Sequence, residues 1–178
     1  MQDLSDEELM ARYTGGDSAA FAALFERYAP RLAALFRRAL PRHVEVQDLV
    51  QQTFLQVHRA RHDYQPGRPL RPWVITIALN LRRKRYRTLS KAERELVVDP
   101  SESGEAARRG LERREREQAL RDALERLRPN QREVIELHWF EGLPFAEVAK
   151  ITGASLSAVK VRAHRAYEAL RGILDPGT

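Results

Sequence analysis

Residues 157–171 carry small, polar and basic side chains at helical spacing, and side chains of these types can bind DNA. The apolar residues in this stretch recur with the period of a helix, about 100° per residue. The predicted buried side consists of Val159, Ala163, Ala166 and Leu170. The opposite side consists of Ser157, Lys160, Val161, His164 and Arg165, with Arg162 at its edge. Arginine and lysine can bind guanine edges or phosphates, and valine can contact a thymine methyl group.

The elements that precede this helix would place it in a DNA groove. Pro129 suits the first position of a helix. Gly142-Leu143-Pro144 ends that helix and lets another begin. The new helix has an apolar side made of Phe145, Val148, Ala149 and Ile151. Because Gly153-Ala154-Ser155 is a short turn with glycine where a helix must stop, residues 127–170 are predicted to form helix, helix, tight turn and helix.

The alternative for this stretch is an ordinary helical hairpin whose basic face is only solvated. DNA binding is favoured over that alternative because the turn, the apolar pattern and the charge all agree. A basic helix that follows a glycine turn is typical of proteins that bind the DNA major groove.

A second stretch with binding chemistry covers residues 73–87, which also have helical periodicity. The predicted buried residues are Ile75, Ala78, Leu79 and Tyr86, with Val74 and Leu81 at one flank. Another face aligns Trp73, Thr76, Asn80, Arg83, Lys84 and Arg87. Cations bind phosphates, an amide can bond a base edge, and bases can stack on aromatic rings. The alternative is a solvated basic helix end, and for Trp73 alone a place in the core is the preferred interpretation.

Residues 63–72, DYQPGRPLRP, are predicted to form the loop before that helix. Three prolines and a glycine oppose regular structure and limit flexibility. Arg68 and Arg71 make the loop cationic. A stiff basic loop beside a helix could receive an extruded base, or it could be a plain connector.

Residues 44–61 are predicted to form a helix with one apolar stripe. The stripe consists of Val46, Leu49, Val50, Thr53, Phe54 and Val57. The opposite face consists of Asp48, Gln51, Gln52, Leu55 and Arg59. A single exposed leucine is common, but an apolar residue ringed by polar ones can be the centre of a partner contact. The residues alone leave these two interpretations open.

His58 and His62 stand four positions apart, which is a metal-ligand spacing on a helix. No Glu follows His58, so the H-E-x-x-H pattern is absent. We therefore interpret both as surface histidines and expect no metal and no cofactor.

The N-terminal part, residues 5–40, is predicted to form two helices broken around Gly15-Gly16-Asp17. Ser5 and Glu8 have the spacing of a capping box, and Asp17 can cap the second helix. The expected core residues are Phe21, Leu24, Phe25, Tyr28, Leu32, Leu35 and Phe36.

Composition between the two binding stretches predicts a linker at residues 89–110, which are rich in Ser, Gly and Glu. A charged helix follows to Leu127, with an apolar side made of Ala119, Leu120, Ala123, Leu124 and Leu127. We predict an all-α fold with two small helical domains, residues 1–88 and 111–178.

The charge and the absence of cysteine limit the class of protein. The chain has 178 residues, a formal charge of +6 and a pI near 10.0, so an anionic partner is expected, nucleic acid before membrane surface. Without cysteine there is neither a disulfide framework nor a cysteine-zinc site. The acidic start of the chain lacks a signal-peptide core, and no apolar run is long enough to insert into a membrane. A cytoplasmic location is the expectation.

Three segments together resemble the sigma-70 family, in its extracytoplasmic-function (ECF) group. FEGLPFAEVAKITGASLSAVKVRAHRAYEAL resembles region 4 of these factors, whereas DLVQQTFLQV and RPWVITIALN resemble parts of region 2. The family usually has Ser near Val161, Leu or Ile near Ala163, and Arg near Tyr167; it has Glu at Gln52 and Trp at His58. The region 4 differences leave the helix-turn-helix pattern intact and concern the promoter sequence that is recognised.

This resemblance implies a non-enzymatic factor that directs bacterial RNA polymerase to promoters. The residues implied in binding the clamp coiled coil of the largest polymerase subunit are Asp48, Leu49, Gln51, Gln52 and Leu55. Those implied at the −10 element, which is read and opened, are Arg68, Arg71, Trp73, Asn80, Arg83, Lys84 and Arg87. Those implied at the duplex −35 element are Ser157, Lys160, Val161, Arg162, His164 and Arg165.

Other partners implied by the resemblance are the polymerase flap and an anti-sigma factor. Two other classes of protein remain as alternatives. A stand-alone helix-turn-helix regulator would bind its operator without polymerase. A helical nuclease or metal enzyme would need a cluster of ligands that is not evident in the sequence.

Overall fold

All the regular elements of the computed structural model are helices. The structure describes residues 3–40, 44–89, 118–120 and 122–174, and within these ranges it contains no strand. The chain divides into two compact units, Met1–Val98 and Asp99–Thr178. The predicted all-α class is confirmed, while most of the predicted linker and the start of the helix after it lie outside the described residues.

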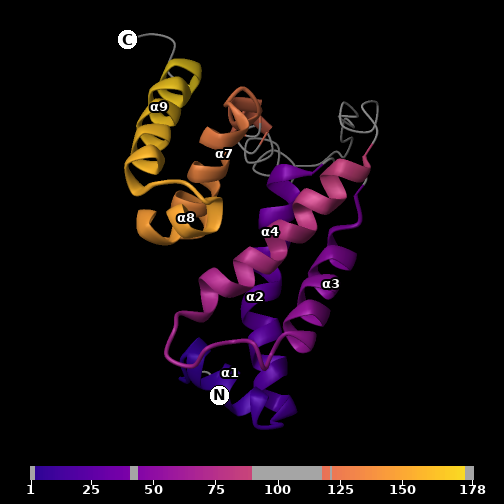
Figure 1. Cartoon of the computed structure of the whole chain (residues 1–178). Helices are drawn as coiled ribbons and strands as arrows, with labels where there is room; N and C mark the ends of the chain where they lie inside the picture. Colours follow the sequence, from indigo (N-terminus) through magenta and orange to yellow (C-terminus); the bar gives the residue numbers. More distant parts are fainter. Residues whose placement is uncertain (1–2, 41–43, 90–117, 121, 175–178) are drawn as a thin grey trace. The chain divides into compact units, whose positions relative to one another are not determined.

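The first unit contains four helices: α1 (Asp6–Thr14), α2 (Ser18–Ala39), α3 (Val46–Arg59) and α4 (Leu70–Thr88). Figure 1 shows α2, α3 and α4 packed along their lengths, with α1 at one end of this bundle. The largest buried side chains of α2 are Tyr28, Leu32, Leu35 and Phe36. They pack with the predicted apolar stripe of α3 and with the buried residues of α4, namely Val74, Ile75, Ala78 and Leu79.

Both predicted helix starts in the N-terminal part are confirmed. The Ser5 N–H donates to Glu8 Oε2 at 2.7 Å and the Glu8 N–H donates to Ser5 Oγ at 3.2 Å, so the capping box is complete. Asp17 Oδ1 accepts from the N–H groups of Ala19 and Ala20 at 3.0 and 3.2 Å. These bonds satisfy N–H groups that a helix leaves without internal partners.

A polar cluster fastens α1 to α2. Arg27 Nη1 donates to the Leu4 carbonyl at 3.0 Å and to Asp6 Oδ1 at 2.5 Å. The Tyr28 hydroxyl donates to Asp6 Oδ2. Burial, together with the carboxylate of Asp6, raises the pKa of Tyr28 far above its ordinary value. The phenol therefore stays protonated and remains a hydrogen-bond donor to Asp6.

Two aromatic residues predicted in the core are exposed. Phe25 is 38% exposed because it lies at the outer edge of the contact between α2 and α3, where its ring packs on Phe54 with centroids 4.7 Å apart. Tyr86 is 45% exposed because it lies near the C-terminal end of α4, where less of the bundle covers it. Apolar periodicity identifies a helix face but not where the neighbouring helices end.

The predicted loop is also shorter than expected, because α4 begins at Leu70 and includes Arg71 and Pro72. A proline is tolerated there, since the first N–H groups of a helix have no intrahelical acceptor.

The second unit contains α7 (Pro129–Ile135), the π-helix η1 (Glu136–Phe140), α8 (Phe145–Thr152) and α9 (Leu156–Leu174), and residues 118–120 and 122–125 are also helical. One core cluster joins Leu124, Leu127, Ile135 and Ala166. Ala119, predicted on the apolar side, is exposed because that side turns away from the cluster at this residue. Of the predicted apolar side of α8, only Val148 is fully buried.

The π-helix is the element that the sequence did not predict. It continues α7 without a break, and the carbonyl of Glu136 accepts from the N–H of Glu141 at 3.1 Å. Glu136 is buried at 2% exposure and pairs with Arg132 at 3.0 Å. Single-turn π segments often occur at functional sites, and this one brings Trp139 and Phe140 to the surface.

Gly153 and Gly172 provide a matched test of the turn before α9. Gly153 has a φ of +67°, and a Cβ atom there would meet no other atom within 4 Å. Gly153→Ala should therefore cost about 1 kcal/mol of unfolding free energy through backbone strain alone. Gly172 lies inside α9 with equally open space, so Gly172→Ala should stabilise by about 0.5–1 kcal/mol.

The measurement is urea unfolding followed by the fluorescence of Trp139, in a Trp73→Phe background that leaves one tryptophan in the chain. Equal effects of the two substitutions would contradict the assigned conformation of Gly153.

Candidate functional site

The turn between α8 and α9 is built as the sequence predicts. Gly153 ends α8 in the left-handed conformation, and the N–H of Ala154 donates to the Ala149 carbonyl at 3.1 Å. Ser155 caps the start of α9: its Oγ accepts from the Ala158 N–H at 3.2 Å and its carbonyl accepts from the Val159 N–H at 3.0 Å. This short turn fixes the direction in which α9 leaves α8.

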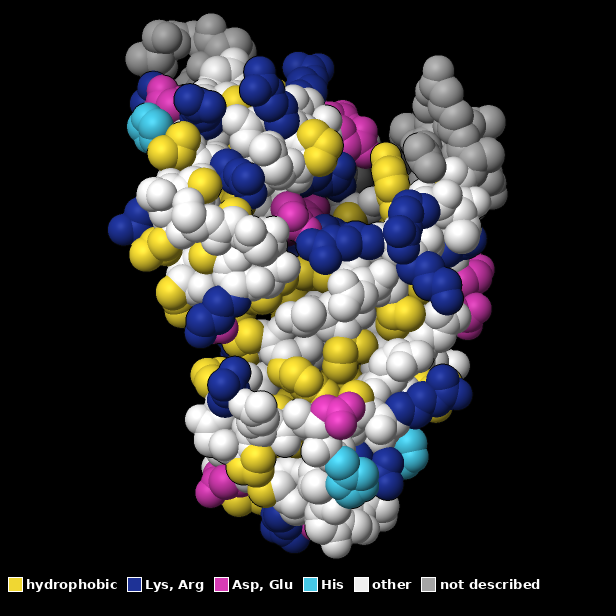
Figure 2. Space-filling model, in the orientation of Figure 1, with side chains coloured by type: hydrophobic (Ala, Val, Ile, Leu, Met, Phe, Trp, Pro, Cys, Tyr) yellow, Lys and Arg dark blue, Asp and Glu magenta, His cyan; other side chains and the backbone are white. Residues whose placement is uncertain are grey.

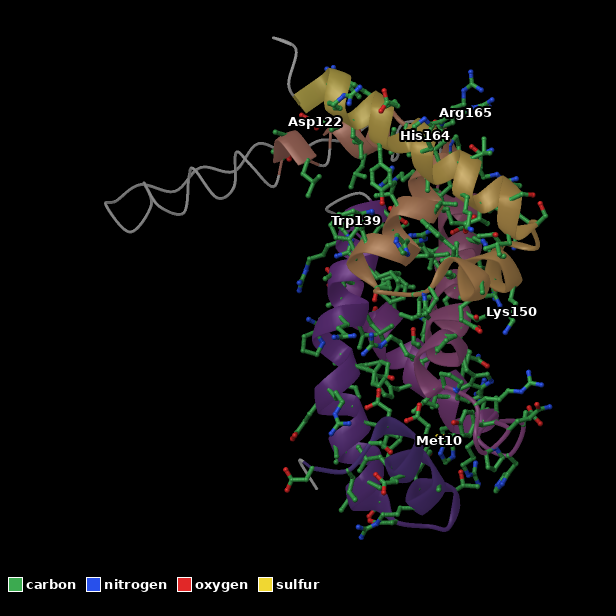
Figure 3. The ribbon with its side chains drawn as sticks, turned by 90° about the vertical axis from the view of Figure 1, so that its left-hand side faces the viewer. Met10, Asp122, Trp139, Lys150, His164 and Arg165 are labelled. Atoms are coloured by element: carbon green, nitrogen blue, oxygen red, sulfur yellow. The ribbon has the colours of Figure 1, made fainter. Side chains whose placement is uncertain are left out.

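The outer side of α9 carries the residues predicted to bind duplex DNA, and we call it the α9 face. Its exposed members are Ser157, Lys160, Val161, His164 and Arg165, and Arg162 is half-buried at its edge. The side chains of Val159, Ala163 and Ala166 are buried on the other side, while Leu170 is half-buried. In Figure 3, His164 and Arg165 project from α9, and Lys150 lies on α8. The predicted partition of this helix is therefore correct.

A second polar surface follows α4, and we call it the Asn80 line. Its members are Trp73, Thr76, Asn80, Arg83, Lys84 and Arg87, of which the last four are exposed. Arg83 Nη1 donates to Asn80 Oδ1 at 3.4 Å. Figure 2 shows Lys and Arg side chains gathered toward the C-terminal end of α4. Positive charge there can hold phosphates while Asn80 bonds a base edge.

Trp73 and Thr76 are less available than the other members of the Asn80 line. The Thr76 hydroxyl donates to the Pro72 carbonyl at 2.7 Å, so it already has an acceptor. The Trp73 ring is half-buried and packs on Tyr64, with centroids 5.5 Å apart. Trp73 is thus partly a core residue, but one edge remains accessible.

The loop that precedes α4 is held in shape by its own hydrogen bonds. The Asp63 N–H donates to the Ala60 carbonyl at 2.9 Å, and the Arg68 N–H donates to the Gln65 carbonyl at 3.2 Å. The Tyr64 hydroxyl donates to the carbonyl of Arg68. Gly67 supplies a φ of +85° that other residues rarely adopt. Residues 65–69 are all exposed, so Arg68 lies on an ordered loop open to solvent.

The structure does not bring Arg71 together with the Asn80 line. On the helical wheel Arg71 lies opposite Asn80, next to the buried Ala78 and Ile75. It lines a cavity of about 400 Å³ with Arg27, Arg31 and Tyr28. The first turn of α4 thus places Arg71 near α2 rather than beside Asn80, and its assignment to the −10 element stays a prediction.

The exposed side of α3 is the third candidate surface, and we call it the Leu55 face. Its members are Asp48, Gln51, Gln52, Leu55 and Arg59, all exposed. Leu49, also predicted to bind polymerase, is only 5% exposed, because it belongs to the stripe that packs inside the bundle. It lines a pocket with Asp48 and Gln52, and its role in polymerase binding stays a prediction.

His58 lies at the end of α3 and contacts Tyr13. The Tyr13 hydroxyl and His58 Nδ1 are hydrogen-bonded, which ties α3 to α1. Both His58 and His62 are exposed, and no metal-binding cluster of His, Cys, Asp or Glu occurs among the described residues.

Two aromatic surfaces were missed by sequence reasoning. Phe25 of α2 is 38% exposed, and its ring packs on the buried Phe54 of α3. In the second unit Trp139 is 63% exposed and contacts Tyr167 edge-on, with centroids 5.6 Å apart. Periodicity assigned no face to Trp139, because the π-helix changes the angular spacing after Ile135.

Two regions of the chain match known protein families. Residues 24–92 match the family description sigma-70 region 2, and residues 117–170 match sigma-70, region 4. RNA polymerase sigma factor CarQ of Myxococcus xanthus is 36% identical over 170 residues, covering 93% of this chain and 95% of CarQ. ECF RNA polymerase sigma factor SigK of Mycobacterium bovis is 30% identical over 179 residues, covering 95% of this chain and 93% of SigK.

The chain belongs to the sigma-70 family, in its ECF group. It is therefore a non-enzymatic factor that directs the initiation of transcription by RNA polymerase, which removes the stand-alone regulator and the metal enzyme from consideration. The solved structure of CnrH in complex with the cytosolic domain of CnrY is similar with a TM-score of 0.74 and 32% identity, and the match covers 97% of this chain and 99% of CnrH. In the described residues no helix is both long and apolar enough to span a membrane.

Substitutions in the α9 face can distinguish a residue that contacts a base from a residue that contacts a phosphate. Arg165 lies within the face and Arg162 at its edge. Arg165→Ala should weaken promoter binding and change the preferred base at one upstream position, because a lost bidentate base contact costs about 1–3 kcal/mol of discrimination. Arg162→Ala should weaken binding similarly on all sequences and reduce the salt slope by about one, as a lost phosphate contact does.

The measurement is promoter-library selection with polymerase and each variant, repeated at two salt concentrations. An unchanged base preference together with a reduced salt slope for Arg165→Ala would assign that residue to phosphate binding instead.

Proposed function

We propose that this sigma factor divides polymerase binding and promoter recognition among three surfaces. The Leu55 face of α3 binds the clamp coiled coil of the largest polymerase subunit. The loop at residues 63–69 and the Asn80 line bind the −10 element as it opens. The α9 face binds the −35 element as a duplex. The observation that carries the proposal is that α3 and α4 pack directly on one another while their exposed faces carry different chemistry.

The chemistry of the Leu55 face suits a protein partner. Leu55 is exposed in the middle of polar side chains, an arrangement in which a central apolar residue contributes most of the binding energy and the rim excludes water. Phe25, which is 38% exposed and packs on Phe54, adds apolar surface where α2 meets α3. Gln52, where the family usually has Glu, makes the contact less dependent on charge.

The chemistry of the α4 surface suits a strand that has left the duplex. Separating strands costs stacking and pairing energy, and capture of extruded bases offsets part of that cost. Asn80 can bond the edge of an unpaired base, while Arg83, Lys84 and Arg87 bind the adjacent phosphates. The ordered loop carrying Arg68 forms the entrance to this surface.

The second unit presents the α9 face to duplex DNA and an aromatic surface elsewhere. Helix-turn-helix proteins place the second helix in the major groove, and α9 carries exposed Lys160 and Arg165 for phosphates and bases. The exposed Trp139 and Phe140 suit the polymerase flap, because aromatic residues are enriched in protein interfaces.

A protein inhibitor and a cytoplasmic location complete the proposal. The similar factor CnrH occurs in a complex with the cytosolic domain of CnrY. We expect a comparable anti-sigma partner for this chain. A factor that acts on promoters together with RNA polymerase must be in the compartment that contains the chromosome. We therefore expect a cytoplasmic location.

The polymerase contact is tested by Leu55→Arg, with Leu156→Arg as the matched control. The two leucines are exposed to 46% and 44%, and they lie in different units. Leu55→Arg should abolish capture by core polymerase in the absence of DNA, because it places a charge at the centre of the contact. The thermal midpoint should change little, since exposed substitutions usually alter stability by less than about 0.5 kcal/mol. Normal capture of Leu55→Arg would remove this face from the polymerase contact.

The promoter-opening role is tested by Asn80→Ala in transcription with purified core polymerase. On duplex promoter the variant should form open complexes about tenfold more slowly, which corresponds to the loss of one amide–base contact. On a template with a pre-opened bubble the loss should be smaller, because the cost of opening has already been met. No loss on either template would exclude Asn80 from the −10 surface.

A further inference from the structure

The start of α4 is capped by a residue from a distant part of the chain. The N–H of Leu70, the first residue of α4, donates to Oε1 of Glu7 in α1 at 2.9 Å. The residue at the N-cap position is Pro69, and no side chain from that position caps the helix. Glu7 thus satisfies one of the N–H groups that the start of a helix leaves without an intrahelical acceptor.

The charge of Glu7 also suits this position. The N-terminus of a helix carries partial positive charge that an adjacent carboxylate stabilises. The first turn of α4 contains no acidic residue of its own, and it contains Pro72, which lacks an N–H group. The carboxylate of Glu7 therefore places a negative charge and a hydrogen-bond acceptor at the start of α4. Asp17 does the same for α2, but as the residue that directly precedes that helix.

Glu7 lies in α1, and α1 is fastened to α2 by the residue before Glu7. The preceding residue, Asp6, pairs with Arg27 at 2.5 Å and accepts from the Tyr28 hydroxyl. The following residue, Glu8, completes the capping box with Ser5. Because the contacts of Asp6 fasten α1 to α2, the cap from Glu7 links the start of α4 to an anchored helix.

The contact between Glu7 and Leu70 lies next to the loop at residues 63–69, which we propose binds the −10 element. Tyr64 packs on Trp73 and donates its hydroxyl to the carbonyl of Arg68. Burial, with a further contribution from the negative charge of Glu7, raises the pKa of Tyr64. Leu70, which ends the loop, is buried at 1% exposure. Glu7 therefore lies where the loop and α4 meet.

We propose that Glu7 is a positioning residue for promoter opening: by capping Leu70 it holds the loop at residues 63–69 and the Asn80 line in the relative geometry that accepts the opened strand. This inference rests on the proposed role of α4. Glu7 touches no DNA in this account. Its effect arises because a binding surface held in its bound conformation loses less free energy on ordering than a mobile one.

The test compares Glu7→Ala, Glu7→Gln and Glu8→Ala in the full chain with core polymerase. Glutamine keeps an oxygen that can accept from Leu70 and should support opening close to the original rate. Glu8→Ala removes the same kind of side chain one position further on, and among the described residues the Glu8 carboxylate bonds to Ser5 at the start of the same helix. Glu7→Ala should slow open-complex formation on duplex promoter about fivefold, the factor that corresponds to one capping hydrogen bond.

Three readouts separate positioning from a general loss of stability. Capture by core polymerase should be unchanged for Glu7→Ala, opening should recover on a pre-opened bubble, and base preference at the −10 element should broaden. Equal behaviour of Glu7→Ala and Glu8→Ala on both templates would overturn the inference. If Asn80→Ala also had no effect on opening, the proposed role of α4 would fail; if Asn80→Ala impaired opening and Glu7→Ala did not, only the role of Glu7 would fail.

Discussion

The packing of α3 on α4 is the constraint on which the first unit depends. Leu49, Val50 and Phe54 of α3 are buried together with Val74, Ile75 and Leu79 of α4. Each helix can bury only one side, so the other side of each remains exposed. Those exposed sides carry Leu55 among polar residues on α3 and Asn80 among cations on α4. One apolar contact thus holds in fixed relation the two faces that we propose bind polymerase and promoter DNA.

In the second unit a short turn determines which side of α9 is exposed. The glycine turn at Gly153 sets α9 against α8, and the buried Val159, Ala163 and Ala166 turn the basic side outward. We propose that α9 binds DNA that is still a duplex and that α4 binds DNA that is opening. In the proposed account the sigma factor assigns duplex binding and strand capture to separate units of one chain.

Local patterns predicted much of this arrangement, and tertiary contacts decided the rest. The capping box at Ser5, the turn at Gly153 and the outward side of α9 depend on neighbouring residues, so the sequence was sufficient. The exposure of Phe25 and the orientation of Arg71 depend on where other helices begin and end. The cap from Glu7 to Leu70 joins residues 63 positions apart, so no local sequence pattern predicts it. Trp139 lies in the π-helix and is 63% exposed, although it stands four positions after the buried Ile135.

The central claim is that adjacent helices of one unit contact different partners, and site-specific photo-crosslinking tests it most directly. A photoreactive amino acid would replace Leu55 or Asn80, and crosslinks would be collected from holoenzyme alone and from open promoter complexes. The account predicts that position 55 crosslinks to the largest polymerase subunit in both states. It predicts that position 80 crosslinks to the −10 strand only in the open complex. Crosslinks from position 55 to DNA, or from position 80 to polymerase in both states, would contradict it.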